Sequence, residues 1–235
     1  MHQISCRASG LVGALAVLSI LFLSQFAFSV GADEQAWISL ACDAERDAWR
    51  GDTSEWKLAG DAIQDPQNPT HLIAQPGSGV LVSLLHEKSL LSNLTSREEY
   101  GDLEAHVEFL IPVGSNGGVK FQGLYEIQIR DSYSKEVTTA SDCGGIYPRA
   151  EEHPHYHLID EGVPPRTNAA KPAGHWQTLD VVFQAARFSP NGQKTKNARF
   201  LKVVLNGELI HENVELKWPT GHAWRTKTEA ARGPL

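Results

Sequence analysis

The chain has 235 residues, of which 41% are hydrophobic, and its 21 Lys and Arg against 28 Asp and Glu give a formal net charge of −7. This length suits one globular domain with a short appendage, and the acidic balance disfavours sequence-independent binding of nucleic acid. The hydrophobic content is too high for a disordered chain, and three cysteines are too few for a scaffold built on disulfides. We therefore expect a folded domain whose partner is small and neutral.

The first 32 residues are typical of an export signal. Arg7 is the only fixed charge among the first ten residues, residues 11–30 are mostly apolar, and Val30-Gly31-Ala32 offers the small residues of a cleavage site. Because the apolar stretch approaches the ~20 residues that span a bilayer, an uncleaved membrane anchor is the alternative. The sequence predicts a signal peptide over 1–32, a single domain over 33–235, an exported protein, periplasmic or secreted, and no membrane contact beyond the signal segment.

Two cysteines, Cys42 and Cys143, follow the predicted signal. In an oxidising compartment they could pair across a long loop, but two unrelated buried thiols fit the sequence equally well. Neither has a neighbouring base in the sequence that would favour a nucleophilic role.

The remaining chain alternates apolar and polar residues with a period of two. Residues 102–111 place Leu103, Ala105 and Val107 on one face, with acidic residues and His106 on the other. This pattern predicts a half-buried strand. Further strands are expected at 79–85, 117–122, 125–130, 145–147, 179–185, 200–205 and 208–213.

Turn residues separate these strands, and no long helical pattern is present. Asn206-Gly207, between two apolar runs, is a strong hairpin signal. Residues 148–174 lack periodicity and predict a long loop that is functional or mobile. Many short antiparallel strands in one domain predict an all-β sandwich or jelly roll, with a polar face left open to a ligand.

Several motifs, in this order and spacing, resemble the 3-keto-disaccharide hydrolase family, whose members are also described as 3-keto-glucoside 1,2-lyase and 3-keto-2-hydroxyglucal hydratase domains. The matching stretches are Trp49-Arg50, Trp56-Lys57, residues 97–104, 114–119, 125–133 and 144–147, His175-Trp176-Gln177, Asn206-Gly207 and residues 213–216. The resemblance implies an exported carbohydrate-active enzyme with a concanavalin-like jelly-roll β-sandwich.

Three departures from the family pattern are visible. Leu40-Ala41-Cys42-Asp43 stands where the family shows Leu-Phe-Asp-Gly, and Asn116-Gly117-Gly118 stands where it shows Asn-Ser-Gly. After the position of Leu235 the family continues with a strand, an Asp-His-Gly turn and a Phe-Arg-Asn-Ile strand. The resemblance therefore implies a sandwich that lacks its C-terminal strands, or a C-terminal region that has diverged from Gly221 onward.

The chemistry that the resemblance implies acts on a glycoside already oxidised at carbon 3. The ketone acidifies the adjacent carbon-bound proton, so a base can remove it, an electrophile can stabilise the enolate, and the glycosidic oxygen can leave before water adds. The catalytic candidates are Glu126 as the base, Gln128 as a donor to the oxyanion, and Asp131 as a second carboxylate. From their spacing alone, these three residues would be interpreted as solvated side chains on the open face of a sheet. The family motif favours the catalytic interpretation instead.

Four further residues are candidates for binding the substrate. Asn116 and Lys120 could donate to sugar hydroxyls or to the enolate oxygen, although turn amides and strand lysines often face water. Tyr147 and Trp176 could stack against a pyranose ring, or Trp176 could belong to the core.

A metal ion is left open by the sequence. His153, His155 and His157 alternate along one segment, a pattern that invites a metal interpretation, although Pro154 and the loop context argue against a fixed three-histidine site. A divalent ion could also act as a Lewis acid on the ketone with Glu126 or Asp131 as ligands. A divalent metal is thus the one cofactor that the sequence leaves open.

The sequence leaves two functions open. The first is an enzyme that cleaves 3-keto-glycosides by hydrolysis, or by elimination followed by hydration. The second is a carbohydrate-binding module of the same fold without catalysis, because fold alone does not fix function.

Overall fold

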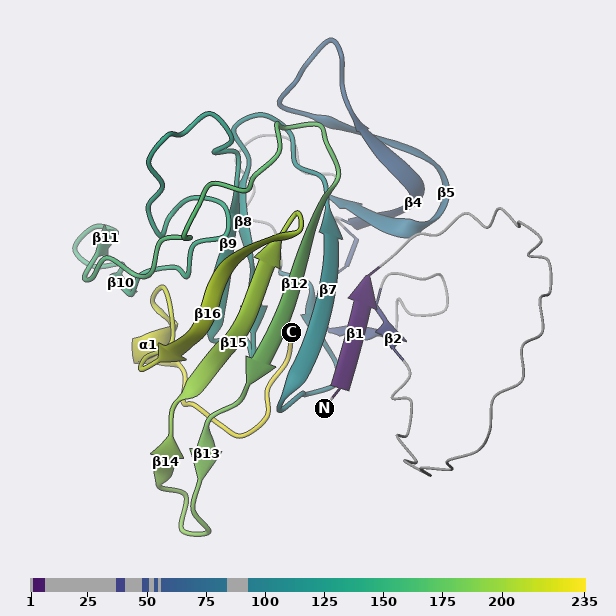
Figure 1. The fold of residues 1–235 in the computed structure, drawn as a ribbon. Coiled ribbons are helices and arrows are strands. Elements are labelled where there is room, and N and C mark those ends of the chain that lie inside the picture. Colours follow the sequence, from purple (N-terminus) through teal and green to yellow (C-terminus); the bar gives the residue numbers. More distant parts are fainter. Residues whose placement is uncertain (1, 7–36, 41–47, 51–52, 55, 84–92) are drawn as a thin grey trace, which may run out of the picture.

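The computed structural model describes residues 2–6, 37–40, 48–50, 53–54, 56–83 and 93–235. One six-stranded sheet forms the front layer (Figure 1). Four of its strands, β7, β12, β15 and β16, pair with their neighbours in antiparallel fashion. In spatial order its strands are β16 (Glu208–Leu216), β15 (Ala198–Leu205), β12 (Gln177–Gln184), β7 (Leu103–Phe109), β1 (His2–Cys6) and β2 (Ile38–Ser39).

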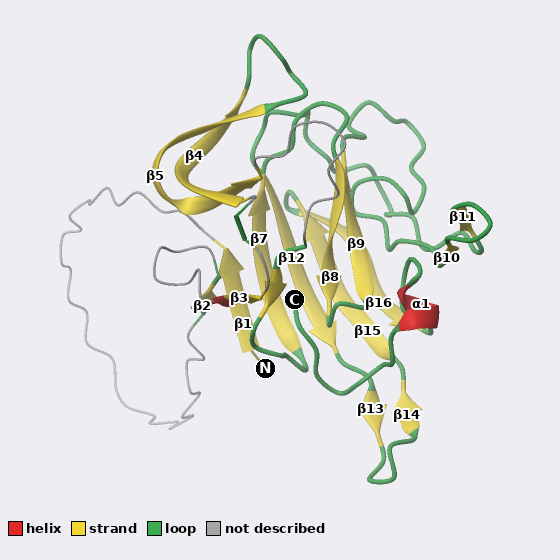
Figure 2. Cartoon of the chain, turned by 180° about the vertical axis from the view of Figure 1, so that it is seen from behind, coloured by secondary structure: helices red, strands yellow, loops and turns green. Residues whose placement is uncertain are grey.

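A second layer lies behind this sheet and consists of β8 (Asn116–Phe121) and β9 (Tyr125–Arg130) (Figure 2). Its inward aromatic rings meet those of the large sheet. Phe121 lies 5.4 Å from Phe183 of β12 and 5.1 Å from Phe200 of β15, measured between ring centroids, and all three side chains are fully buried. The core therefore lies between two sheets, and the predicted all-β sandwich is confirmed.

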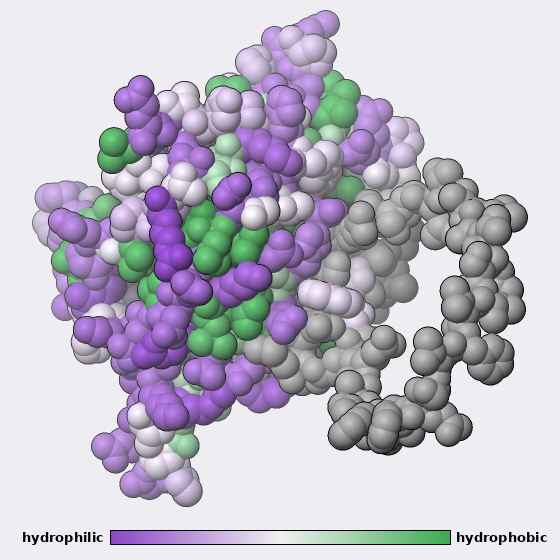
Figure 3. Space-filling view, in the orientation of Figure 1, coloured by the Kyte–Doolittle hydropathy of each residue, from purple (hydrophilic) through white to green (hydrophobic). Residues whose placement is uncertain are grey.

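The alternation along β7 is also confirmed. Leu103 and Ala105 are buried in the core, whereas His106 points outward and contacts Asp180 of β12, with 2.6 Å between Nδ1 and Oδ1. On this outward face, charged side chains border a smaller apolar area (Figure 3). His106 therefore lies on the outer surface of the large sheet. The outer surface of β9 is on the other side of the sandwich.

A long hairpin is only partly predicted by the sequence pattern. It consists of β4 (Trp56–Gln64) and β5 (Leu72–Ser83) and projects from one corner of the sandwich (Figure 1). The expected strand at 79–85 covers only the end of β5, and residues 84 and 85 lie outside the described residues. A register shift between Ala59 and Asp61 interrupts the alternation, which is why the pattern did not predict β4.

Short elements complete the fold. They are β3 (Trp49–Arg50) with β6 (Thr95–Ser96), β10 (Ala150–Glu151) with β11 (His157–Leu158), β13 (Arg187–Phe188) with β14 (Lys194–Lys196), and helix α1 (Ala223–Thr226). The expected loop over 148–174 contains the β10–β11 pair. The expected strand at 145–147 is reduced to single bridges from Ile146 to Ile127 and to Val163.

The N-terminal strand β1 pairs in parallel with β7 and lies within the predicted signal peptide. Residues 7–36, which include most of that prediction and its cleavage site, lie outside the described residues. Within the described ranges, no helix has the length and apolar character needed to cross a bilayer. Export and cleavage stay predictions.

The C-terminal segment is fastened to the core through Glu229. Its carboxylate accepts the hydroxyl hydrogen of Tyr125 and pairs with Lys194 of β14, at 2.6 Å between Nζ and Oε2. Burial raises the pKa of Tyr125, and the adjacent Glu229 raises it further. Tyr125 therefore stays a neutral donor, and the segment is held against β9.

Cys143 is a free and fully buried thiol, and burial raises its pKa. Cys42 lies outside the described residues, and the free Cys143 thiol agrees with the alternative of two unrelated cysteines.

Candidate functional site

Strands β8 and β9 present their polar residues on the face that points away from the core. In β9, Tyr125 and Ile127 are fully buried against the large sheet, so the alternating Glu126 points to the other side. Lys120 lies directly opposite Glu126, and Gly118 lies opposite Gln128. The antiparallel register thus brings together residues that are separated along the chain.

Glu126 and Lys120 form an ion pair across the two strands, with 3.4 Å between Oε2 and Nζ. The Glu126 side chain is 14% exposed and that of Lys120 is 35% exposed. A carboxylate and an ammonium group therefore stand side by side where a ligand can reach both.

Gly118 makes room for the Glu126 carboxylate. A Cβ atom at Gly118 would overlap Oε1, Cγ and Cδ of Glu126, whereas a Cβ at Gly117 would meet nothing within 4 Å. The absence of a side chain at Gly118 therefore sets where the carboxylate lies.

Tyr147 flanks Glu126 on the opposite side from Lys120. The N–H of Tyr147 donates to the carbonyl of Glu126 at 3.1 Å. The segment that carries Tyr147 therefore runs along the edge of β9 that does not face β8. The phenol oxygens of Tyr147 and Tyr156 lie 2.8 Å apart. Burial raises the pKa of Tyr156, and its hydrogen bond to Tyr147 and the charge of Glu126 raise it further, so the phenol stays neutral.

Thr220 fixes the backbone of Glu126. Its hydroxyl accepts the N–H of Glu126 at 2.9 Å and donates to the carbonyl of Leu124 at 3.0 Å. Thr220 is itself buried, so this contact holds the strand without competing for the carboxylate.

Gln128 shares the outward face of β9 but is only 3% exposed. Its N–H donates to the carbonyl of Gly145, and its carbonyl accepts the N–H of Gly144, so the 144–145 segment lies along this edge of the strand. Its amide nitrogen donates to Oδ1 of Asn116 at 2.5 Å. Gln128 therefore orients Asn116 and is not one of the solvated outward residues that spacing alone favoured.

Asp131 lies at the end of β9, on the side of the turn that precedes β8. Its Oδ2 accepts the N–H of Gly114 at 2.9 Å, and among the described residues no hydrogen bond or ion pair joins it to Glu126. Of the three predicted catalytic residues, Glu126 alone carries a charged group beside Lys120.

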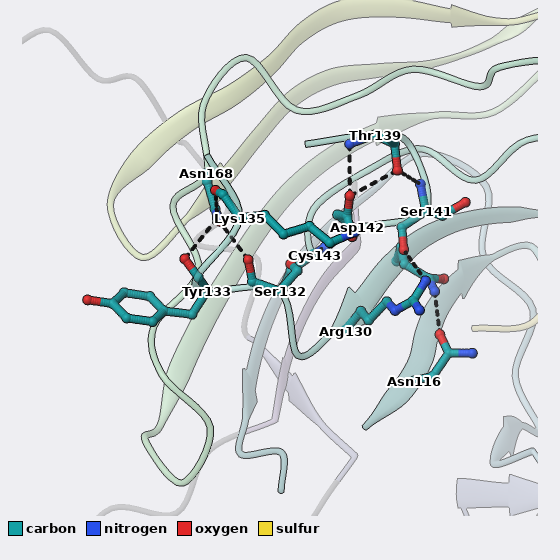
Figure 4. Close-up of polar contacts among 11 residues, drawn as sticks. Asn116, Arg130, Ser132, Tyr133, Lys135, Thr139, Ser141, Asp142, Cys143 and Asn168 are labelled. Carbon is teal, nitrogen blue, oxygen red and sulfur yellow. Dashed lines mark hydrogen bonds and ion pairs between the residues drawn. The ribbon is translucent and has the colours of Figure 1, made fainter. Parts of the chain in front are cut away.

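The loop that follows β9 is organised by the buried carboxylate of Asp142 (Figure 4). It accepts hydrogen bonds from Lys135 at 2.7 Å and from the backbone and hydroxyl of Thr139 at 2.9 Å. Burial alone would raise the pKa of Asp142, but these donors outweigh it and hold the pKa below its usual range. The Asn168 amide also ties the loop through the carbonyls of Ser132, Tyr133 and Lys135.

A cavity of about 1660 Å³ opens between the β4–β5 hairpin, the end of β7 and the edge of β8. Glu126, Lys120, Asn116 and Trp176 line it. The indole nitrogen of Trp176 donates to Oδ1 of Asp61 at 3.0 Å, and its ring packs on the small apolar cluster of the hairpin. Trp176 is therefore a fixed wall of the same cavity that Glu126 enters.

Within the described residues, no group of three or more His, Cys, Asp or Glu side chains could hold a metal ion. Of the three histidines that invited a metal interpretation, His155 and His157 have ring centroids 5.7 Å apart, and Nδ1 of His157 bonds to the carbonyl of His155. A divalent ion that acts as a Lewis acid on the ketone, with Glu126 or Asp131 as ligands, stays an open prediction.

Comparison with known proteins identifies the family of the chain. The profile of the 3-keto-alpha-glucoside-1,2-lyase-like domain matches residues 36–235. The chain belongs to this family. The resemblance seen in the sequence motifs is thereby confirmed, and family membership supports a carbohydrate-active role.

One solved structure is similar over part of the chain, a protein from Parabacteroides distasonis provisionally named as a glycosyl hydrolase. The two chains are 22% identical with a TM-score of 0.47, over 60% of this chain and 57% of that one. The match thus spans little more than half the length of that protein. No curated protein matches the chain.

Sequence reasoning missed two residues that the structure brings to Glu126, namely Thr220 and Tyr156. Thr220 lies 94 residues from its partner, and no local pattern marks it. Tyr156 could have been singled out as an aromatic residue amid three histidines, but its contact with Tyr147 depends on how the loop folds back.

Proposed function

We propose that the protein cleaves glycosides whose sugar ring carries a ketone at carbon 3, by elimination followed by addition of water. The observation that supports this most directly is the pair formed by Glu126 and Lys120, which lie 3.4 Å apart and both line the cavity. Elimination next to a ketone needs a base and a cation for the enolate oxygen, and this pair supplies both groups.

In the proposed reaction, Glu126 removes the proton from carbon 2 of the oxidised ring. The electron pair of that C–H bond forms the enolate, whose oxygen lies against the Lys120 ammonium. The bond between carbon 1 and the glycosidic oxygen then breaks, and the departing oxygen takes a proton from Glu126 or from water. Water adds across the resulting double bond and yields the free 3-keto sugar.

The remaining polar residues position the ring in this proposal. Asn116, oriented by Gln128, faces the cavity and offers an amide to sugar hydroxyls. Tyr147 and Tyr156 offer two phenol hydroxyls on the side of Glu126 away from Lys120. Trp176 forms an aromatic wall. Asp131 lies at the strand end and supports the turn before β8, so its role is to position Asn116.

The proposal is tested by incubating the protein with a 3-keto-α-glucoside and with the unoxidised glucoside in deuterated water. We expect release of the aglycone from the oxidised substrate alone, with deuterium at carbon 2 of the product sugar. Release without deuterium would point to direct hydrolysis and overturn the enolate step. Binding of the oxidised sugar without any release would favour the carbohydrate-binding module.

A further inference from the structure

Strand β8 borders the cavity with one of its two edges. Among the described residues it pairs with β9 alone, which lies along its other edge. Five consecutive residues, 116–120, line the cavity. Because the side chains of consecutive strand residues point to opposite faces, a cavity that touches all five meets the edge of the strand and not only one face. The main chain of β8 is therefore part of the wall of the candidate site.

The hydrogen bonds of β9 show which main-chain groups of β8 face this edge. The N–H of Gln128 donates to the carbonyl of Gly145, and its carbonyl accepts the N–H of Gly144, both at 2.8 Å. Both groups of Gln128 thus point away from β8. Its register partner Gly118 therefore belongs to a pair of the antiparallel ladder that exchanges no main-chain hydrogen bond. The N–H and the carbonyl of Gly118 point away from β9, toward the cavity.

Within the part of the chain that the structure describes, no hydrogen bond uses the N–H or the carbonyl of Gly118. Its neighbour Gly117 differs, because it forms the adjacent pair of the ladder with Ile129, in which the two residues exchange main-chain hydrogen bonds. Each main-chain N–H is a strong donor that needs an acceptor. Gly118 therefore presents a donor that is open to a ligand in the cavity.

This open N–H belongs to the residue over which the Glu126 carboxylate lies. A Cβ atom at Gly118 would overlap Oε1 and Cδ of Glu126, whereas the space around a Cβ at Gly117 is empty within 4 Å. The ammonium group of Lys120 lies 3.4 Å from the same carboxylate. A carboxylate, an ammonium group and an open main-chain N–H thus come from neighbouring positions of one hairpin, and all three residues line the cavity.

The proposed elimination needs donors near its base. When Glu126 takes the proton from carbon 2, the electron pair of that C–H bond forms a double bond between carbons 2 and 3. The oxygen on carbon 3 then takes up the negative charge. A donor that the fold holds in place stabilises this charged oxygen more than it stabilises the neutral ketone. A strand N–H is fixed in this way, whereas a lysine ammonium sits on a flexible four-carbon stem.

We propose that the main-chain N–H of Gly118 is a second donor, beside Lys120, to the oxygen on carbon 3. This inference rests on the proposed function and deepens it, because it assigns a main-chain group to the step that forms the enolate. The glycine at position 118 would then serve twice, since it leaves room for the base and lets the oxygen reach the N–H.

Replacement of one amide by an ester tests the donor, because no side-chain substitution at this position removes the N–H alone. Glycolic acid in place of Gly118, introduced by translation with a suppressor tRNA, deletes the N–H and adds no Cβ atom, so the Glu126 carboxylate keeps its place. On a 3-keto-α-glucoside we expect kcat to fall about 10²- to 10³-fold, with KM changed by less than about threefold.

Glycolic acid in place of Gly117 is the matched control. This ester deletes an N–H that is bonded to β9 and does not face the cavity. We expect it to lower the melting temperature and to keep the wild-type kcat. Equal losses of kcat in the two esters, or a wild-type kcat in the Gly118 ester, would overturn the proposal.

Amide hydrogen exchange tests the same contact without turnover. In the free ¹⁵N-labelled protein, the Gly118 amide, identified by its loss in the Gly118 ester, should exchange fast, and the Gly117 amide should be protected. Saturating methyl α-glucoside, which is not oxidised, should slow exchange at Gly118 and leave Gly117 unchanged. If wild type cleaves no 3-keto-glucoside, the proposed function fails, while slower exchange at Gly118 still supports the contact. An unchanged exchange rate at Gly118 rejects it.

Discussion

The Glu126 carboxylate lies over the Cα atom of Gly118, on the neighbouring strand, in space that any other residue at position 118 would fill. Gly118 has no positive φ that would require glycine, so the reason for glycine here is the close approach of the side chain opposite. The position of the proposed base is thus set by a residue that has no functional group.

Gly118→Ala should therefore lower kcat without unfolding the protein. The added methyl group displaces the carboxylate from Lys120, and misplacing a general base costs on the order of 10²-fold in rate. Gly117→Ala, one residue earlier with open space around its Cβ, is the matched control and should keep wild-type kcat. Kinetics on the 3-keto-α-glucoside, with melting curves of both variants, measure the effect. Equal kcat in the two variants would show that the carboxylate can move without loss.

Glu126→Gln should abolish aglycone release while the sugar still binds. The amide keeps the size of the side chain but cannot accept the carbon-bound proton, and loss of a general base costs roughly 10²- to 10⁴-fold in kcat. Single-turnover kinetics and calorimetric titration with the substrate distinguish the two effects. If the variant retains more than about a tenth of the wild-type kcat, Glu126 is not the base.

Lys120→Met should lower kcat more than it raises KM, because the ammonium contributes chiefly when the enolate oxygen carries its charge. Loss of one such group costs about 10²- to 10³-fold. Lys120→Arg retains a cation and should recover part of the rate. A variant with an unchanged kcat and a raised KM would assign Lys120 to ground-state binding instead.

His211 should make the protein less stable in mild acid. The ring is 2% exposed, and Nε2 donates to the carbonyl of Gly144 at 2.7 Å. Burial lowers the pKa of His211 in the folded protein, so below the unfolded value of ~6.5 the unfolded chain binds a proton that the folded one excludes. Stability is therefore lost as the pH falls from that value toward the folded pKa, by at most ~1.4 kcal/mol per pH unit.

His211→Gln removes this titration and keeps a donor for the Gly144 carbonyl. Between about pH 7 and pH 5 the difference in unfolding free energy between wild type and variant should shift in favour of the variant, as measured by urea titration. A difference that stays constant with pH would mean that the pKa of His211 is the same in the folded and the unfolded chain.

The fold could be predicted further than the site. The alternation at Leu103 and Ala105 and the hairpin at Asn206-Gly207 depend on local pattern, and both are present in the structure. Only the end of β5 was predicted from the β4–β5 hairpin, because a register shift breaks the alternation. Local pattern also placed Glu126 on the polar face of its strand, since a strand period of two needs no tertiary information.

The rest of the site depends on packing between distant segments. Gln128 follows the same alternation as Glu126 but is buried, because the 144–145 segment lies along its strand edge. Thr220 and Tyr156 reach the site only after their loops fold back. The roles of the seven predicted site residues remain predictions that the variants above begin to test.

The hydrogen bond from Glu126 to Thr220 joins residues 94 positions apart, and Tyr125 is tied to Glu229 over an even longer interval. A chain that emerges from the ribosome from its N-terminus completes the strands of both sheets before these partners are available. A nascent or proteolysed chain without residues 217–235 would thus keep the strands of the sandwich but lack the contacts of Thr220 and Glu229 with β9. Folding of the sandwich and completion of the site are then separate events, and the site is complete only once the segment that carries Thr220 and Glu229 has been made.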